Sequence, residues 1–204
     1  MATQRISIFP LSGAVLFPGL PLPLHIFEPR YRAMISDALA RDRRIGMIQP
    51  QHPVEGAPLF TVGCLGRIGE IQALPDGRFN LVLEGEARFR VVSEREVTTP
   101  FRQVDGELFD EPEDEVLAPV ERALFEREAR RFAAIQGYRV DWDALSRLDD
   151  QRLINGTAHV APFDPASKQA LLEAPDLRSR CELVIQLMQF FSRRDSDEDR
   201  ATLQ

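Results

Sequence analysis

The chain has 204 residues, a length that accommodates one large domain or two small ones. Hydrophobic residues make up 44% and charged residues 28%, which excludes a disordered or fibrous protein. The net charge of -7 argues against a nucleic-acid-binding protein, because a phosphate-binding surface needs clustered, excess Lys and Arg.

The first half of the chain is predicted to consist of strands with one early helix. Ile6 and Ile8 alternate with polar residues, as in a half-buried strand. The segment Leu11–Pro23 is expected to be an extended, ordered loop, because its prolines lack the N–H group that a helix needs. A proline at the first position and apolar residues at helical spacing then predict a helix over Pro29–Arg41.

Short apolar runs separated by turn residues follow this helix and predict an antiparallel sheet or small barrel. The turn Pro75-Asp76-Gly77 indicates a hairpin, since Pro presets φ and Gly accepts a positive φ. The runs are Ile45–Ile48, Val62–Ile71, Phe79–Leu83, Phe89–Val92 and Phe101–Leu108.

The acidic run Asp110–Glu115 marks the predicted domain boundary, because its like charges repel and its proline interrupts regular structure. After it the apolar period changes from two to about 3.6, which predicts helices. The expected division is a β domain over residues 1–110, a helical bundle over 116–192 and a flexible tail over 193–204. The helices are expected near Val120–Ile135, Asp141–Leu148, Asp150–Asn155, Pro165–Leu172 and Asp176–Phe191.

The residue types that catalysis requires are not arranged at catalytic spacing. A phosphate-binding loop needs a lysine after paired glycines, and the single lysine, Lys168, has no such glycines before it. We interpret Lys168 as an exposed amine on a helix. The three histidines form no pair at metal-ligand spacing, and His25 is interpreted as a hydrogen-bonded structural residue. We therefore expect no catalytic residue, no metal and no cofactor.

The location of the protein also follows from what the sequence lacks. Residues 1–5 show no secretory signal, and no stretch reaches the ~18 apolar residues that span a bilayer. We expect a cytoplasmic protein without a membrane partner. In a reducing cytoplasm Cys64 and Cys181 are not expected to form a disulfide, and we interpret both as buried hydrophobic side chains.

The opening of the chain resembles the N-terminal, substrate-binding domain of Lon proteases. The resemblance covers nearly the whole chain, and its proline placement is specific. It implies an α+β fold, with a PUA-like antiparallel β-barrel followed by a helical bundle. The ATPase and the Ser-Lys peptidase that follow this domain in Lon are missing, so the chain resembles a stand-alone member. The matching residues are Phe9–Leu11, Val15–Gly19, Leu22–Tyr31, Met34, Val62-Gly63, Arg67-Ile68, Asp76–Arg78, Gly85, Arg88–Arg90 and Lys168–Glu173.

The resemblance favours a non-catalytic module that binds unfolded or hydrophobic polypeptide segments, as an adaptor or chaperone-like factor. The candidate substrate-binding residues are Phe17, Leu20 and Leu22, which rigid prolines would hold out of regular structure, and Tyr31 on the adjoining predicted helix. A stripe of this kind also fits a hydrophobic core.

Other interpretations stay open. The charged residues of the signature, Glu28, Arg30 and Arg88, fit internal ion pairs as well as ligand contacts. The alternative function is a PUA-like module that binds a small ligand or RNA, although the acidic net charge makes nucleic acid an unfavoured partner. A hydrolase is the weakest hypothesis.

Overall fold

The chain forms two compact units. The computed structural model describes residues 3–110, 112 and 115–202, and from residue 194 onward it describes the backbone alone. The first unit comprises Met1–Glu111 and Asp164–Leu172, and the second comprises Pro112–Phe163 and Glu173–Gln204. No helix in the described part of the chain is long and apolar enough to cross a bilayer.

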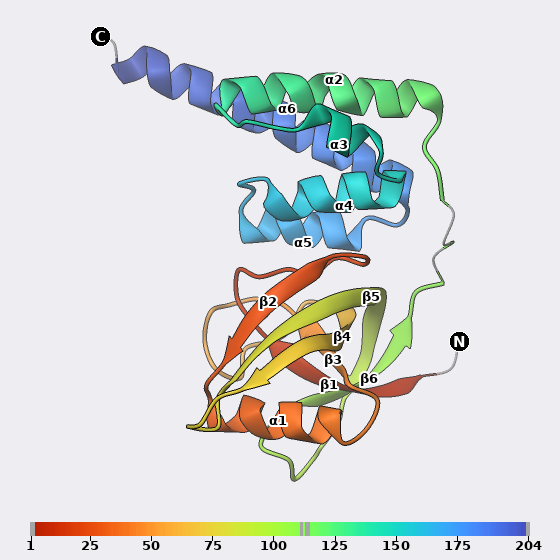
Figure 1. The fold of residues 1–204 in the computed structure, drawn as a ribbon, viewed down its shortest axis with the longest axis vertical. Helices are drawn as coiled ribbons and strands as arrows, with labels where there is room; N and C mark the ends of the chain where they lie inside the picture. Colours follow the sequence, from red (N-terminus) through yellow and green to blue (C-terminus); the bar gives the residue numbers. More distant parts are fainter. Residues whose placement is uncertain (1–2, 111, 113–114, 203–204) are drawn as a thin grey trace. The chain divides into compact units, whose positions relative to one another are not determined.

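The first unit is a closed sheet with one additional edge strand (Figure 1). The strand order is β2-β5-β4-β3-β1-β6, and β6 also pairs with β5, so five strands close on themselves while β2 lies at the edge beside β5. All pairs are antiparallel except β1 with β3. The strands are β1 (Gln4–Pro10), β2 (Pro21–Ile26), β3 (Arg44–Ile48), β4 (Val62–Ala73), β5 (Phe79–Glu94) and β6 (Gln103–Leu108).

β5 is one continuous strand, although the sequence predicted two separate runs. Its first half pairs with β2, with Leu83 opposite Leu22, and its second half pairs with β6, with Phe89 opposite Leu108. β5 therefore pairs with two strands, β2 and β6, along the same edge. The sequence analysis divided this strand because Glu84 and Glu86 interrupt the apolar runs. Both residues face solvent, and β5 pairs with β4 on either side of them.

The core of the first unit is centred on Phe89, which is fully buried. A Cβ added at Gly63 would lie 2.6 Å from its ring, so the absent side chain makes room for the aromatic group. The helix α1 (Pro29–Leu39) begins at the predicted proline and buries Met34 and Ile35. Buried residues packed around Phe89 are Ile6, Ile8, Ile48, Leu65 and Val104.

The proline-rich segment is a loop only over its first part, because Pro21–Ile26 forms β2. The loop backbone passes directly over Gly85 of β5: the N–H of Gly19 donates to the Gly85 carbonyl at 2.9 Å, and the Gly85 N–H donates to the Leu20 carbonyl at 2.9 Å. A Cβ at Gly85 would lie 2.1 Å from the Phe17 carbonyl oxygen. The glycine therefore permits the loop to dock on the sheet.

Helix α5 (Pro165–Glu173) was predicted within the helical bundle, whereas Asp164–Leu172 belongs to the first unit. The buried Gln169 side chain donates to the Val62 carbonyl at 3.0 Å. The fully buried Arg88 guanidinium donates to the Leu172 carbonyl at 2.7 Å. These polar side chains satisfy backbone groups across elements, which the hydrophobic period of a helix cannot reveal.

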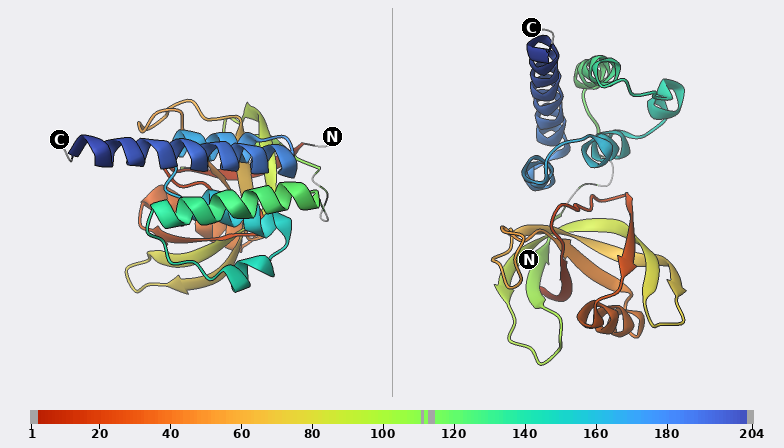
Figure 2. Two further views of the ribbon diagram at one scale, coloured as in Figure 1. Left: turned by 90° about the horizontal axis from the view of Figure 1, so that it is seen from above. Right: turned by 90° about the vertical axis from the view of Figure 1, so that its left-hand side faces the viewer.

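The second unit is built from four helices, of which α2 and α6 lie side by side (Figure 2, left). The predicted helices are present, and two extend further than expected. α4 continues through Asn155, which is buried and accepts a hydrogen bond of 2.9 Å from Arg180. α6 continues past Phe191. The helices are α2 (Pro119–Ile135), α3 (Trp142–Ser146), α4 (Asp150–Val160) and α6 (Leu177–Thr202).

The two segments that were predicted to be irregular lie partly outside the described residues. The residues outside the description are 111, 113 and 114 of the acidic linker and 203 and 204 of the tail. The described end of the linker is anchored within the second unit, because Glu115 accepts a hydrogen bond of 3.1 Å from the Leu177 N–H.

Candidate functional site

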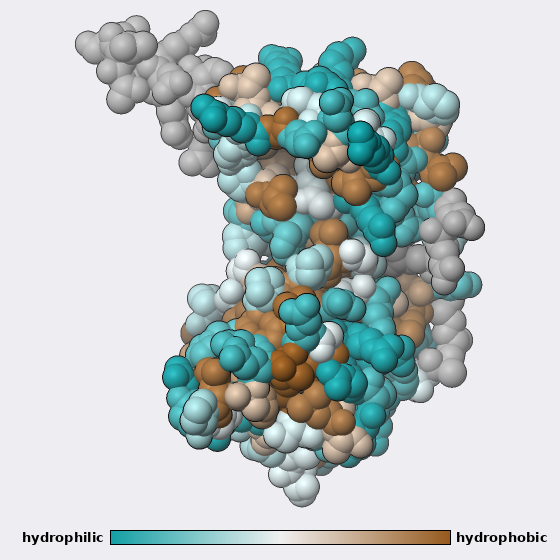
Figure 3. Space-filling view, in the orientation of Figure 1, coloured by the Kyte–Doolittle hydropathy of each residue, from teal (hydrophilic) through white to brown (hydrophobic). Residues whose placement is uncertain are grey.

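An open groove of about 510 Å³ lies on the first unit, along strands β2, β5 and β4. Its surface is mainly apolar, and Figure 3 shows hydrophobic residues gathered on the first unit where Figure 1 draws β4 and β5. Concave, mainly apolar surfaces with a few polar groups are typical of binding sites. This β2–β5 groove is lined by Pro23, Leu24, His25, Glu70, Ile71, Gln72, Asn80, Leu81 and Val82.

Strand register places the side chains of this groove. Pro23 lies opposite Val82, and His25 lies opposite Asn80, in the antiparallel pair of β2 and β5. Gln72 of β4 lies opposite Asn80 on its other side. Because side chains alternate along a strand and opposed residues share a face, these five residues project from one face of the sheet. The apolar pair thus sits beside a polar row.

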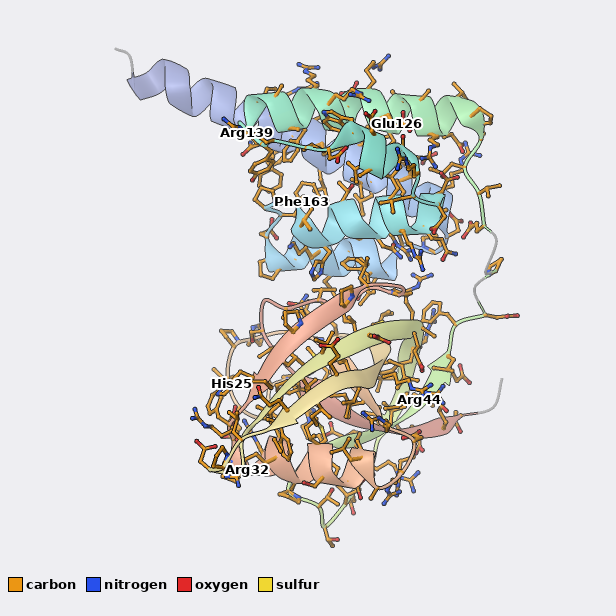
Figure 4. All side chains as sticks on the ribbon, in the orientation of Figure 1. His25, Arg32, Arg44, Glu126, Arg139 and Phe163 are labelled. Carbon is orange, nitrogen blue, oxygen red and sulfur yellow. The ribbon has the colours of Figure 1, made fainter. Side chains whose placement is uncertain are left out.

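The polar row forms a chain of hydrogen bonds around His25, which Figure 4 labels on the first unit. Asn80 Oδ1 lies 2.6 Å from His25 Nδ1, and the Arg78 guanidinium lies 3.3 Å from His25 Nε2. Since Arg only donates, Nε2 accepts and Nδ1 carries the proton. Asn80 donates to Gln72 at 3.4 Å, and Arg78 pairs with Asp76 at 2.7 Å. His25 is hydrogen-bonded, as predicted, and its structural role stays a prediction.

The pKa of Asp76 at the end of this row is lowered. The main cause is the backbone N–H of Arg78, which donates to the carboxylate, and the Arg78 guanidinium adds to it. The lowered pKa keeps this carboxylate charged at neutral pH, where it pairs with Arg78.

The four predicted substrate-binding residues do not form one exposed surface. Phe17 is fully buried, so the expectation that the prolines hold it out is wrong. Tyr31 on α1 is only 7% exposed, so it does not form part of an exposed surface either. The docking of the loop backbone on Gly85 turns Phe17 inward. Leu20 and Leu22 are half-buried, and neither lines the groove.

Tyr31 is part of a packed aromatic and ionic cluster. Its ring lies 4.3 Å from the ring of Phe9, and the Arg30 guanidinium lies 4.7 Å above it. Burial raises the pKa of Tyr31. Arg30 in turn pairs with Glu28 at 2.9 Å and with Glu55. The charged residues at this end of the signature therefore make internal pairs.

The groove residues Pro23, Ile71 and Val82 were missed by the sequence analysis. One signal pointed to them. Prolines at every second position, as in Pro21 and Pro23, have the period of a strand and are tolerated in a sheet at an edge. Interpreting that segment as a loop removed β2 from the predicted sheet, and with it one wall of the groove.

The groups that the sequence analysis considered for catalysis, Lys168 and the two cysteines, are at least half-buried. Lys168 is half-buried, not exposed as expected, and burial lowers its pKa. Both cysteines are buried as predicted, and burial raises the pKa of Cys181 to about 12. The described residues contain no group of three or more His, Cys, Asp or Glu that could hold a metal ion.

Comparison with protein families decides the relationship. The family model of the ATP-dependent protease La (LON) substrate-binding domain matches residues 5–189. The chain belongs to this family. It is 29% identical over 196 residues to Lon protease 2 of Myxococcus xanthus, covering 91% of this chain and 23% of that protein. It is 26% identical over 194 residues to the Lon protease of Escherichia coli (strain K12), covering 91% of this chain and 24% of that protein.

The chain thus spans less than a quarter of these Lon proteases, and the matched part is the substrate-binding domain. Solved structures show the same fold. A Lon N-terminal domain protein from Xanthomonas campestris superposes with a TM-score of 0.70 at 22% identity, covering 90% of this chain and 98% of that one. The N-terminal domain of a Mycobacterium avium complex Lon protease gives 0.67 at 21% identity, covering 91% and 98%. The predicted α+β, PUA-like fold is confirmed.

Proposed function

We propose that this Lon-family domain binds unfolded or hydrophobic polypeptide segments in the cytoplasm, as an adaptor or chaperone-like factor that does not cut them. The observation that carries the proposal is the β2–β5 groove, which sets the apolar pair Pro23 and Val82 beside a polar row. Apolar client side chains fit the pair, and the polar row offers hydrogen bonds to the client backbone.

The backbone of the edge strand β2 is poorly suited to strand addition. We therefore expect side chains of the groove, and not the β2 backbone, to hold such a client. Pro21 and Pro23 have no N–H group, so the ladder to β5 takes its donors from Leu22 and Leu24. The free edge of β2 then presents carbonyl groups and the single N–H of His25. An added strand would lack partners for most of its carbonyls.

The composition of the groove favours polypeptide over nucleic acid. Among the described residues that line it there is one carboxylate, Glu70, and neither Lys nor Arg. A phosphate backbone would therefore meet the Glu70 carboxylate and no cationic lining residue. Leu20, directly before β2, and Leu22, its second residue, stay as proposed substrate contacts outside the groove, because both are half-buried.

Binding is tested with a fluorescently labelled protein that has been permanently unfolded by reduction and carboxymethylation. We expect a Kd in the micromolar range or weaker, roughly -8 kcal/mol or less favourable, because ordering the client costs part of the interaction energy. Val82→Lys places a charge in the groove and is expected to weaken binding about tenfold.

Val92→Lys is the matched control. It changes the same residue type on the same strand, outside the groove and at a position that is already 54% exposed. Equal loss in both variants, or no loss in Val82→Lys, would remove the groove from the site. Binding of an RNA oligonucleotide but of no unfolded protein would establish the alternative function.

The lack of catalysis is tested on the same protein preparations. We expect neither ATP hydrolysis nor casein cleavage, since Lys168 is the only lysine and no phosphate-binding glycines precede it. Turnover that disappears in Lys168→Ala would contradict this expectation.

A further inference from the structure

The second unit carries a helix face of unusual composition on α2. Residues at helical spacing along its solvent side are apolar or basic, and none is acidic. Val120 is 74% exposed, Leu124 38% and Ile135 41%. This outer face of α2 comprises Val120, Ala123, Leu124, Arg127, Arg131, Ala134 and Ile135, all of which are exposed.

The acidic residues of α2 are turned away from this face and are already paired within the unit. Glu121 accepts from the Ala118 N–H and pairs with Arg178 at 2.9 Å. Glu126 pairs with Arg122 at 3.1 Å. The remaining one, Glu128, is buried. The face is therefore basic although the whole chain has a net charge of -7.

Two arginines lie between the apolar ends of the face. Arg127 contacts Glu128 at 3.1 Å, yet its side chain is 71% exposed. Arg131 lines a hollow of about 110 Å³ between α2 and α6, together with Arg193. Glu128 also lines this hollow, but its carboxylate is engaged by Arg127 and, at 3.3 Å, by Gln189. The hollow thus offers two cations to an incoming carboxylate.

We propose that the outer face of α2 docks an amphipathic helix that carries carboxylates and belongs to another protein. The apolar residues extend from Val120 to Ile135, roughly 22 Å along the axis, which matches about four turns of a partner helix. Leucine-like side chains of that helix pack on the apolar ends, and its Asp or Glu residues meet Arg127 and Arg131.

Charge complementarity argues against a second copy of this chain as the occupant. Arg127 lies at the middle of the face, so two copies packed through it, in either direction, would bring their two Arg127 guanidinium groups together. Nucleic acid is disfavoured as well, because phosphates gain nothing from exposed Val120, Leu124 and Ile135. An acidic helix satisfies the apolar and the basic parts at once.

The test uses two synthetic amphipathic helices with identical leucine positions, one with glutamates and one with lysines on the flanks. Binding to the full chain is measured by fluorescence anisotropy. We expect the glutamate peptide to bind about tenfold tighter than the lysine peptide, and its affinity to fall with added salt. The double variant Arg127→Glu/Arg131→Glu is expected to reverse this preference.

Controls separate the face from general charge effects. Arg147→Glu changes an exposed arginine of the same unit outside the face, and it should leave the preference for the glutamate peptide intact. Leu124→Ser should weaken both peptides, with circular dichroism confirming that every variant is folded. The proposal is overturned by equal affinity for the two peptides, by an unchanged preference in the double variant, or by self-association that Leu124→Ser abolishes.

Discussion

The buried side chains of Gln49 and Gln169 are joined by a hydrogen bond of 3.2 Å, although 120 residues separate them. Gln49 lies just after β3, and Gln169 lies on α5. Gln169 also donates to the Val62 carbonyl of β4, and Gln49 to the Pro165 carbonyl at the start of α5. This pair of amides attaches a late helix to the sheet that the first half of the chain builds.

Replacing one of these amides should therefore destabilise the protein. Gln169→Ala leaves the Val62 carbonyl and the Gln49 amide without this partner inside the core, and we expect a loss of about 2–3 kcal/mol in the free energy of unfolding. Urea denaturation measures the change. The control, Gln186→Ala, removes an exposed glutamine of α6 and should change stability by less than about 0.5 kcal/mol. Equal effects would refute a structural role for the buried pair.

Gly85 is expected to tolerate no side chain. A Cβ there lies 2.1 Å from the Phe17 carbonyl oxygen, so Gly85→Ala must displace the loop that docks on β5, at a cost of about 2–3 kcal/mol. Gly156→Ala is the matched control: it lies in α4 with no atom within 4 Å of the new Cβ, and it should raise stability by up to about 1 kcal/mol. Thermal unfolding compares the two. A neutral Gly85→Ala would contradict the close approach.

Cys181 should be unreactive in the folded protein. Burial raises the pKa of its thiol from 9.0 to about 12, so the reactive thiolate is scarce at neutral pH. Iodoacetamide at roughly pH 8, near the usual thiol pKa, should label neither Cys181 nor the buried Cys64 until urea is added. Mass spectrometry of labelled peptides reads out each site. Rapid labelling of Cys181 without denaturant would show that the helical unit opens locally.

The same shift predicts a pH dependence of stability. The folded-state pKa of Cys181 lies above its unfolded value. The stability that the buried neutral thiol contributes is therefore fully present below pH 9.0. It is lost as the pH rises toward 12, since the unfolded chain releases the proton first. In Cys181→Ala the free energy of unfolding should fall less steeply between pH 9.0 and about 12 than in the unchanged protein. Urea denaturation at a series of pH values in this range measures the difference.

The proposed division between the units is open to limited proteolysis. With a Glu-specific protease we expect the first cuts between Glu107 and Glu121, where the acidic run Asp110–Glu115 concentrates glutamates, or in the tail after Arg193. Mass spectrometry of the fragments locates the cuts. Early cleavage within Phe60–Val92 would show that the boundary near Pro112 is wrong.

Local signals in the sequence determined most elements of this fold. Alternation predicted β1, and short apolar runs between turn residues predicted β3, β4 and β6. A proline followed by apolar residues at helical spacing predicted α1 at its first residue. Such periods report only which side of an element is apolar, and that information is carried by a few neighbouring residues. The opening signature likewise indicated the family, because its proline spacing can be read without the fold.

The tertiary structure alone decided where these elements pack and which apolar residues stay exposed. Phe17 is buried because Gly85, far along the chain, lets the loop settle on β5. α5 joins the sheet because buried amides find backbone partners there. The β2–β5 groove exists because Pro23 and Val82 come into register. Each depends on a partner distant in sequence, so no local pattern of hydrophobic residues encodes it.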